Sequence, residues 1–348
     1  MQRNNETREN MSTIKDVAKL AGVSPSTVSR VLSGQGPSAA SEKTREKIWE
    51  AVRKTGYSVN ETARKLRKKP VDVAEPEQTI DCILARELDY FIDPFLYSLR
   101  QMMEEELFKR GYRLRAQFGI SDMQRYLNDD SSKRDAAIIL GRVDMQNFKI
   151  IKNNYRHLIY TGLQDLDLDI DSVICSGYDA ICTAMDYLVK LGHRKICYLG
   201  ETKSEQRYDA YITHGKELGI PNDRRLVVDV SFTPSDSYNG LKKALEGGLD
   251  CTAIICANDV SALGVMKLLK EKRISVPNDM SVIGVNDMEN TRFLEPMLTT
   301  MSVHTAEMGS HVVKLLIDRI KKNHFTPVKL YIPSHLIERE SCSPPKST

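Results

Sequence analysis

A short stretch near the amino terminus, GVSPSTVSRVL at residues 22–32, combines hydroxyl side chains with one arginine. We expect its apolar positions to face inward: Val28, Val31 and Leu32. The outer face then carries Pro25, Ser26, Ser29 and Arg30. Short hydroxyls can hydrogen-bond phosphates or base edges at close approach, and an arginine can bridge O6 and N7 of guanine. The pattern therefore favours a face that reads DNA, and the plainer alternative is a small solvated helical bundle.

Three helix signals surround this face. Ser12 or Thr13 precedes IKDVAKLA, Ser24 precedes a helix with Pro25 at its first position, and Ser41 precedes EKTREKIWEAVRKTG. Gly22 allows a sharp turn between the first two helices, as a helix-turn-helix requires. We expect the DNA contacts of this head to come from Thr13, Ser24, Pro25, Ser26, Thr27, Ser29 and Arg30.

The charge distribution is consistent with that interpretation. Residues 11–70 hold 13 Lys and Arg against 5 Asp and Glu, a charge of +8, whereas the whole chain of 348 residues carries only +3. Residues 71–348 therefore sum to −5, because residues 1–10 balance. A basic head on an acidic body is typical of a nucleic-acid binder with a second function.

From Ile80 onward, apolar runs of strand length alternate with amphipathic runs of helix length. The candidate strands are IDCILA, YRLRAQF, DAAIILG, HLIYTG, SVICS, KICYLG, LVVDVSF, TAIICA, MSVIGV and VKLYIP. This alternation predicts an α/β body with two doubly wound parallel-sheet subdomains. A ligand is expected at the carboxyl ends of the strands, in the cleft between the subdomains.

The segments TIKDVAKLAGVSPSTVSRVLSG and SEKTREKIWEAVRKTGYSVNETARKL resemble the head of the lactose repressor/galactose repressor family. The resemblance implies an all-α helix-turn-helix head, a periplasmic-binding-protein-like body, and a homodimer on a pseudo-palindromic double-stranded operator. It places Pro25, Ser26 and Arg30 at base-reading positions. It also implies a short hinge helix at residues 60–66, with DNA contacts from Asn60, Ala63, Arg64 and Leu66. Ala63 is small enough for two such helices to pack together, and Leu66 is an apolar wedge for the minor groove.

The same resemblance implies a small sugar effector and residues that bind it. Arg207 would hold the ligand, Asp259 would accept hydrogen bonds from its hydroxyls, and Phe232 would cover its C–H groups. In MSVIGVNDMEN, where many relatives have an aromatic and two acids, we expect Asp287 to bind ligand. Plainer interpretations stay open: a surface ion pair for Arg207, a helix N-cap for Asp259 and a core position for Phe232.

The resulting domain prediction has five parts. Residues 1–11 form a disordered arm, 12–58 the head, 59–78 the hinge helix and linker, 79–340 the body and 341–348 a disordered tail. Within the body, one subdomain takes 79–172 and 298–323, and the other takes 173–297 and 324–340.

Other function classes have less support. No GxSxG, HExxH or GxGxxG motif is present, so we expect no catalytic residues and no cofactor. The acidic run GLQDLDLDID lacks the spacing of a calcium loop and is expected to be solvated, so no metal site is predicted. Seven scattered cysteines, no membrane span and no secretory signal indicate a cytoplasmic protein.

ELDYFIDPFLYSLR and GVNDMEN look most like galactose-type regulators of Gram-positive bacteria, which suggests galactose or a galactoside. Two alternatives remain at this stage: a regulator of the same fold that needs a corepressor, and a sugar-binding protein serving transport.

Overall fold

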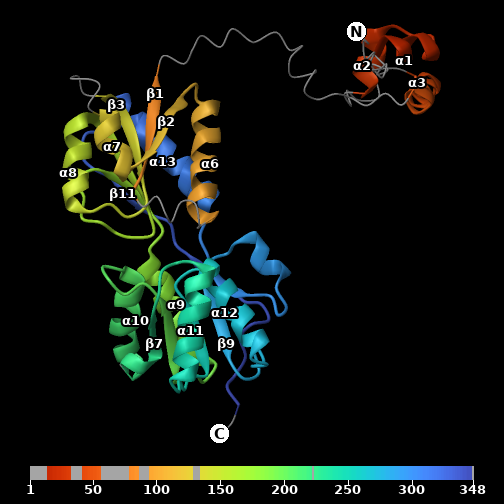
Figure 1. Cartoon of the computed structure of the whole chain (residues 1–348). Coiled ribbons are helices and arrows are strands. Elements are labelled where there is room, and N and C mark those ends of the chain that lie inside the picture. Colours follow the sequence, from red (N-terminus) through yellow and green to blue (C-terminus); the bar gives the residue numbers. More distant parts are fainter. Residues whose placement is uncertain are drawn as a thin grey trace, which may run out of the picture. The chain divides into compact units, whose positions relative to one another are not determined.

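The computed structural model describes residues 14–32, 41–55, 78–85, 94–127, 134–221 and 223–346. The chain divides into two compact units, Met1–Glu75 and Pro76–Thr348, which we call the head and the body (Figure 1).

Three helices make up the described part of the head: α1 (Ile14–Ala21), α2 (Pro25–Leu32) and α3 (Glu42–Thr55). Their small core consists of Val17, Ala18, Val28, Val31, Ile48 and Ala51. Between α1 and α2, Gly22 has a φ of +67°, a backbone conformation that strongly favours glycine. The helix-turn-helix predicted from the sequence is confirmed.

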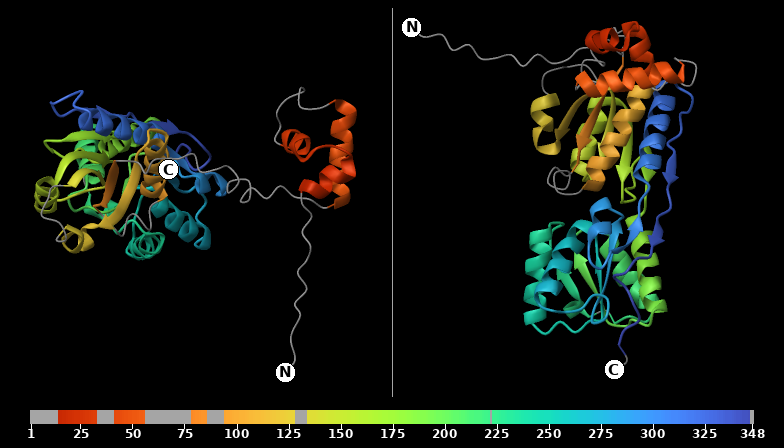
Figure 2. Two further views of the ribbon diagram at one scale, coloured as in Figure 1. Left: turned by 90° about the horizontal axis from the view of Figure 1, so that it is seen from above. Right: turned by 90° about the vertical axis from the view of Figure 1, so that its right-hand side faces the viewer.

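The body has two lobes (Figures 1 and 2). The first lobe is built on a six-stranded parallel sheet with the order β11-β5-β4-β3-β1-β2. Its strands are β1 (Thr79–Leu84), β2 (Arg113–Gly119), β3 (Arg134–Leu140), β4 (Tyr155–Gly162), β5 (Asp171–Ile174) and β11 (Lys329–Tyr331). Its helices are α6 (Pro94–Lys109), α7 (Ile120–Leu127), α8 (Met145–Asn154) and α13 (Thr305–Ile320).

The second lobe has a six-stranded sheet with the order β12-β10-β9-β8-β6-β7, in which only β12 pairs antiparallel. Its strands are β6 (Ile196–Gly200), β7 (Val227–Asp229), β8 (Ala253–Cys256), β9 (Ser281–Asn286), β10 (Thr299–Ser302) and β12 (His335–Ile337). Its α-helices are α9 (Gly177–Lys190), α10 (Gln206–Glu217), α11 (Pro234–Glu246) and α12 (Asp259–Glu271). Two short 3₁₀ turns are η2 (Arg224–Leu226) and η3 (Glu289–Phe293).

The central strands form because their apolar runs are buried on both faces. Every residue of β8 and β9 is buried, as expected for parallel strands covered by helices on both sides. The α11 helix begins at Pro234, because the Thr233 hydroxyl accepts from the Asp236 amide and a proline suits the first helical position.

The chain crosses between the lobes three times, after β5, after β10 and after β11. Two of these crossings correct the predicted subdomain ranges. Residues 299–302 form β10 of the second sheet, although 298–323 was assigned to the first lobe, and residues 329–331 form β11 of the first sheet, although 324–340 was assigned to the second. β11 pairs with β5, which is distant in sequence, and β10 is a short, mostly polar strand, so local pattern assigns neither of them to a sheet.

The carboxyl-terminal tail also differs from the prediction of disorder. The Val282 amide donates to the carbonyl of Ser341 at 2.8 Å, and the Ser341 hydroxyl accepts from the Thr299 amide at 2.8 Å. The Ser343 carbonyl accepts from His193 Nε2 at 2.9 Å. Residues 341–343 are therefore part of the second lobe, because they satisfy buried main-chain groups of β9 and β10.

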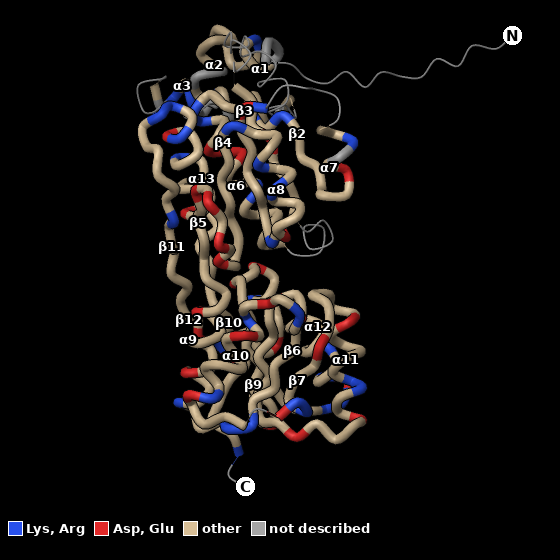
Figure 3. The backbone as a smooth tube through the Cα atoms, turned by 90° about the vertical axis from the view of Figure 1, so that its left-hand side faces the viewer, with Lys and Arg blue, Asp and Glu red and all other residues tan. Residues whose placement is uncertain are grey.

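Buried carboxylates tie together the amino ends of strands in the first lobe, where Figure 3 shows Lys and Arg near β2, β3 and β4. Asp81 of β1 accepts from Arg115 at 2.6 and 3.0 Å and from the Tyr155 hydroxyl at 2.7 Å. Asp171, at the end of the acidic run expected to be solvated, is 1% exposed and accepts from Arg319 at 2.7 and 2.8 Å. Its pairing holds the pKa of the Asp171 carboxyl below its ordinary value, although burial alone would raise it.

All seven cysteines are free thiols. In the part of the chain that the structure describes, no helix has the length and apolar character needed to span a membrane.

Candidate functional site

The outer face of α2 contains exposed polar groups. Pro25 and Ser26 are exposed and Thr27 is partly exposed, whereas Val28 and Val31 are buried in the head core, as predicted. The Ser24 hydroxyl accepts from the Thr27 amide at 3.2 Å and lies 2.7 Å from the Ser26 hydroxyl. Exposed hydroxyls at a helix N-terminus are suited to phosphate or base-edge contacts.

Several predicted DNA contacts cannot be placed in this way. Ser29 and Arg30 lie within α2, but the structure describes the backbone alone at these positions. The remaining predicted contacts lie outside the described residues: Thr13, Asn60, Ala63, Arg64 and Leu66.

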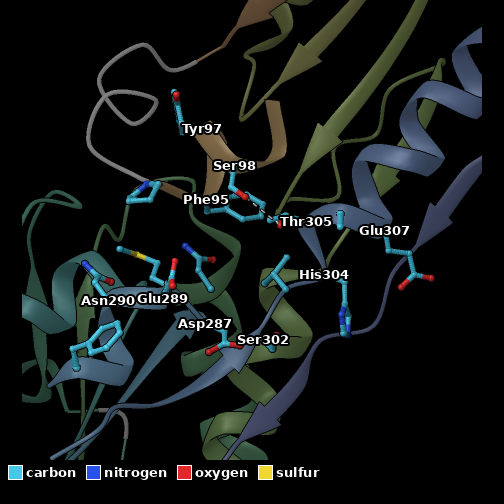
Figure 4. Close-up of a pocket in the computed structure, with 16 residues that line it drawn as sticks. Phe95, Tyr97, Ser98, Asp287, Glu289, Asn290, Ser302, His304, Thr305 and Glu307 are labelled. Atoms are coloured by element: carbon cyan, nitrogen blue, oxygen red, sulfur yellow. Dashed lines mark hydrogen bonds between the residues drawn. The ribbon is translucent and has the colours of Figure 1, made fainter. Parts of the chain in front are cut away.

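A cavity with a volume of about 880 Å³ lies between the two lobes of the body (Figure 4). On the first-lobe side it is lined by Pro94, Phe95, Tyr97 and Ser98 at the start of α6. On the second-lobe side it is lined by residues 286–290 and Phe293, which follow β9. Residues 302–307, at the crossing from β10 into α13, complete the wall.

The lining combines carboxylates, hydroxyls and aromatic rings. Among the described lining residues, the acids are Asp287, Glu289 and Glu307, and the one basic side chain is His304. The Ser98 hydroxyl of α6 and the Thr305 hydroxyl of α13 lie 3.4 Å apart on the first-lobe side of the cavity (Figure 4). Carboxylates accept from hydroxyl donors and rings cover C–H groups, so the cavity has the chemistry to bind a polyol.

Asp287 is the one predicted ligand residue that lines this cavity. Its carboxylate pairs with Arg339 and, at 3.4 Å, with Arg292. Asn286 and Asp287 have φ values of +119° and +51°, which non-glycine residues rarely adopt. Such strained backbone often occurs at functional positions, and here it directs two polar residues to the end of β9.

Asp259 lies behind the cavity wall and is 0% exposed. One carboxylate oxygen accepts from the Met288 amide at 2.8 Å, and the other accepts from the Thr300 hydroxyl at 2.7 Å. The N-cap of α12 is Asn258, which accepts from the Ser261 amide at 2.9 Å. Asp259 therefore fixes the loop that carries Asp287, and a direct ligand contact would have to replace or share one of its two bonds.

Arg207 and Phe232 lie together at the carboxyl edge of the second sheet but outside the residues that line the cavity. The guanidinium centre is 4.5 Å from the centroid of the Phe232 ring, and Arg207 Nη1 donates to the Ala257 carbonyl at 2.7 Å. Arg207 is 6% exposed and Phe232 is 5% exposed. The structure thus brings these two predicted residues together, after the adjacent strands β6 and β7.

Glu205 was not predicted from the sequence, although it contacts Arg207 most closely. Its two carboxylate oxygens accept from Arg207 Nε at 2.8 Å and from Nη2 at 3.0 Å. Burial alone would raise the pKa of the Glu205 carboxyl, but the positive charges of Arg207 and Arg142 hold that pKa below its ordinary value. The Arg207 guanidinium, which we expect to hold ligand, is therefore already paired with a buried carboxylate.

The start of α6 and the 302–307 crossing were also missed. His304 lines the cavity, and its Nε2 lies 2.9 Å from Nδ1 of His335, the first residue of β12. The two histidines therefore connect the segment that crosses between the lobes after β10 with the segment that crosses after β11. The sequence offered only one signal for the first-lobe wall, the aromatic residues around Pro94 in YFIDPFLY.

Two family profiles match the chain. Residues 13–60 match "Bacterial regulatory proteins, lacI family", and residues 185–342 match "Periplasmic binding protein-like domain". The chain is 30% identical over 336 residues to the HTH-type transcriptional repressor PurR of Glaesserella parasuis, covering 94% of this chain and 95% of that protein. It is 27% identical over 343 residues to the repressor MelR of Bacillus subtilis, covering 95% and 98% of the two chains.

Solved structures share the fold. A transcriptional regulator CelR–cellobiose complex has a TM-score of 0.67 at 24% identity, and covers 95% of this chain and 99% of its own. The lac repressor dimer bound to operator and the anti-inducer ONPF has a TM-score of 0.66 at 23% identity, with the same coverage. A ribose-bound regulator from Enterococcus faecium has a TM-score of 0.65 at 22% identity, and covers 77% of this chain and 99% of its own.

Proposed function

The chain belongs to the lacI family of bacterial regulatory proteins as a DNA-binding transcriptional repressor, and we propose that a neutral sugar in the body's cavity releases it from its operator. The observation that carries this proposal is the 880 Å³ cavity between the lobes, lined by carboxylates, hydroxyls and aromatic rings.

The charge of the lining favours a neutral effector. Asp287 is already paired with Arg339 and Arg292, but Glu289 and Glu307 add negative charge, and the described lining has no lysine or arginine to pair with a phosphate or carboxylate on the ligand. Sugar hydroxyls, in contrast, can donate to Asp287 and Glu289, and their C–H faces can pack on Phe95 or Tyr97. The cellobiose and ribose complexes of proteins with this fold are consistent with a sugar. Galactose or a galactoside is our first candidate, on the resemblance of ELDYFIDPFLYSLR and GVNDMEN alone.

We assign roles to the four predicted ligand residues. Asp287 contacts the sugar directly from the cavity wall, and Asp259 holds the loop of Asp287 in place. Arg207 donates to the sugar from the inner end of the cleft, with its guanidinium held over Phe232.

DNA binding would use the outer face of α2 and the hinge segment 60–66, in a homodimer on a pseudo-palindromic operator. The lac repressor structure of the same fold is a dimer on operator DNA, which supports this arrangement. We place the protein in the cytoplasm, where the operator DNA would be. A transport role loses its basis because the head matches regulatory proteins.

A regulator of the same fold that needs a corepressor is the second candidate, because the family resemblance does not decide the sign of the ligand's effect. In that case the small molecule strengthens operator binding instead of weakening it. Operator affinity measured with and without ligand distinguishes the two candidates.

The test is fluorescence anisotropy on a symmetric duplex selected from a random pool. The ligand panel contains galactose, galactosides, cellobiose, ribose and galactose phosphate. We expect one neutral sugar to lower operator affinity by about 5- to 150-fold and galactose phosphate to have no effect. Arg207→Lys should keep operator affinity and lose the response. Arg225→Lys is the matched control, because Arg225 also pairs with an acid two residues earlier but is 87% exposed. Tighter operator binding with any member of the panel would replace our proposal with the corepressor alternative.

A further inference from the structure

Glu205 concentrates more contacts than its position requires. It is the N-cap of α10, where it accepts from the Arg207 amide at 3.1 Å. The same carboxylate receives both Nε and Nη2 of Arg207, at 2.8 and 3.0 Å. Glu205 is 1% exposed.

Capping alone does not account for a glutamate here. Asn, Asp, Ser and Thr are the preferred N-cap residues, because their short side chains reach the first helical amides. The chain itself supplies the comparison: Asp223 caps η2, accepts from the Arg225 amide at 2.9 Å and pairs with the Arg225 guanidinium at 2.6 Å. That pair has the same spacing, but it lies at the surface and contains the shorter acid.

The longer side chain lets Glu205 reach the first lobe as well. Gln164, which follows β4, donates to Glu205 at 3.1 Å, and Arg142, which follows β3, lies 3.6 Å from it. Arg142 also pairs with Glu201 at 3.2 Å and donates to the Ser204 carbonyl at 2.6 Å. Glu205 therefore faces one arginine from its own lobe and one from across the cleft.

The neighbouring contacts close the cleft at the same place. Gln206 accepts from the Asp165 amide at 2.9 Å and donates to the Asp165 carbonyl at 2.8 Å. Together with Glu201, Glu205, Arg142 and Arg207, these groups form what we call the cleft network. Its two acids balance its two arginines, so no net charge is left in the partly buried junction.

We propose that Glu205 pairs with the effector-binding arginine, Arg207, while no ligand is bound. When a ligand binds Arg207, the Glu205 carboxylate shifts its pairing to Arg142 on the other side of the cleft. This inference rests on the proposed function, because it assumes that Arg207 binds the effector. Glu205 occupies the edge of the guanidinium formed by Nε and Nη2, so a ligand that accepts from this edge of Arg207 displaces at least one oxygen of Glu205. The freed oxygen stays satisfied by strengthening the contact to Arg142 and Gln164. Ligand binding and the relative position of the lobes are coupled by this exchange.

Two substitutions separate this role from a structural one, because they shift effector affinity in opposite directions. Glu205→Gln releases Arg207 and should tighten binding of the sugar identified in the panel by roughly tenfold. Arg142→Gln removes the alternative partner of Glu205 and should weaken binding by a similar factor. Asp223→Asn, the surface pair, should leave it unchanged. A loss of affinity in both cleft variants would indicate plain loss of structure and overturn the inference.

A second measurement does not depend on the sugar. Spin labels attached through non-natural amino acids at the exposed positions 146 on α8 and 216 on α10 report the distance between the lobes. The distance distribution should broaden in Glu205→Gln and Arg142→Gln but not in Asp223→Asn. If both cleft variants are folded by circular dichroism and their distance distributions are unchanged, the contacts of Glu205 with Arg142 do not hold the lobes together, and the inference is refuted. If no sugar binds the wild-type protein but the distance distributions broaden in the two cleft variants, the proposed effector is wrong, and the role of Glu205 in connecting the lobes is supported.

Discussion

At the scale of single residues, Arg30 is the clearest candidate for reading a base. It lies in α2, two residues from the buried Val28, on the helix whose exposed face includes Pro25 and Ser26. Arg30→Ala should relax preference at one base pair of each half-site and cost about 1–3 kcal/mol of binding free energy. Anisotropy against single-substituted operators measures both effects. Lys43→Ala, at an exposed position of α3, is the control and should not change which base is preferred. A uniform loss over all operators would mean that Arg30 contacts phosphate only.

A second prediction at this scale concerns pH. His193 is 1% exposed, and its ring nitrogens lie 2.8 Å from the Thr252 hydroxyl and 2.9 Å from the Ser343 carbonyl. Burial lowers the pKa of His193 below its ordinary 6.5. Below pH 6.5 the unfolded chain therefore binds a proton that the folded chain resists, so stability falls as the solution is acidified. His193→Gln should make the fall in unfolding free energy between pH 7 and pH 5 shallower, as measured by urea denaturation.

His214 provides a control of opposite sign. Burial alone would lower the pKa of His214, but hydrogen bonds to Asp186 and Glu217 outweigh it, and the pKa is raised. This group stabilises the fold below pH 6.5 and loses that effect as pH rises through its folded pKa. His214→Gln should therefore steepen the acid-side loss. The same slope in both variants would contradict these assignments.

At the scale of elements, the carboxyl-terminal residues 341–343 act as an extension of the second sheet. They accept from or donate to Ser281, Val282 and Thr299, and Ser341 is 0% exposed. A chain that ends at residue 340 should lose about 2–4 kcal/mol of unfolding free energy, because these buried groups lose their partners. A chain that ends at residue 344 keeps the three residues and should match the full protein in urea denaturation. Equal stability of both truncations would show that residues 341–343 contribute nothing.

Some strands of the two sheets can be predicted from the sequence and others cannot. β3 and β8 are continuous apolar runs whose burial requires no knowledge of their partners, and the sequence predicts them well. β10 is Thr299–Ser302, a mostly polar run without such a pattern, and it becomes a strand only by pairing with β9. β12 is three residues long and pairs with β10, so it too depends on the assembled sheet.

Some residues of the candidate site can likewise be predicted from the sequence, and others cannot. Asp287 follows a strongly patterned strand, so its place at the strand end could be predicted. The contribution of α6 to the cavity depends on how the lobes meet, which no local pattern encodes. Glu205 was missed for a similar reason: its neighbours Arg142 and Gln164 are 41 or more residues away.

At the scale of the whole molecule, the two units differ greatly in the core that holds them together. The described head core contains six buried residues, whereas the body has three larger clusters that span both lobes. Because the head and body bury their apolar residues separately, they should unfold separately. A head of roughly 45 residues would contribute an unfolding enthalpy of about 30 kcal/mol, a small fraction of the whole.

Scanning calorimetry can test this with ligands that bind one unit each. Operator DNA should raise the temperature of the smaller transition, and the effector sugar, in the absence of DNA, should raise only the larger one, because each stabilises the unit that binds it. A fragment of residues 76–348 should lack the smaller transition and bind the sugar as the full chain does, since every cavity-lining residue and the cleft network lie within it. A single transition that both ligands shift equally would mean that head and body fold as one cooperative unit, and the coupling between sugar and operator would then not need the hinge segment to transmit it.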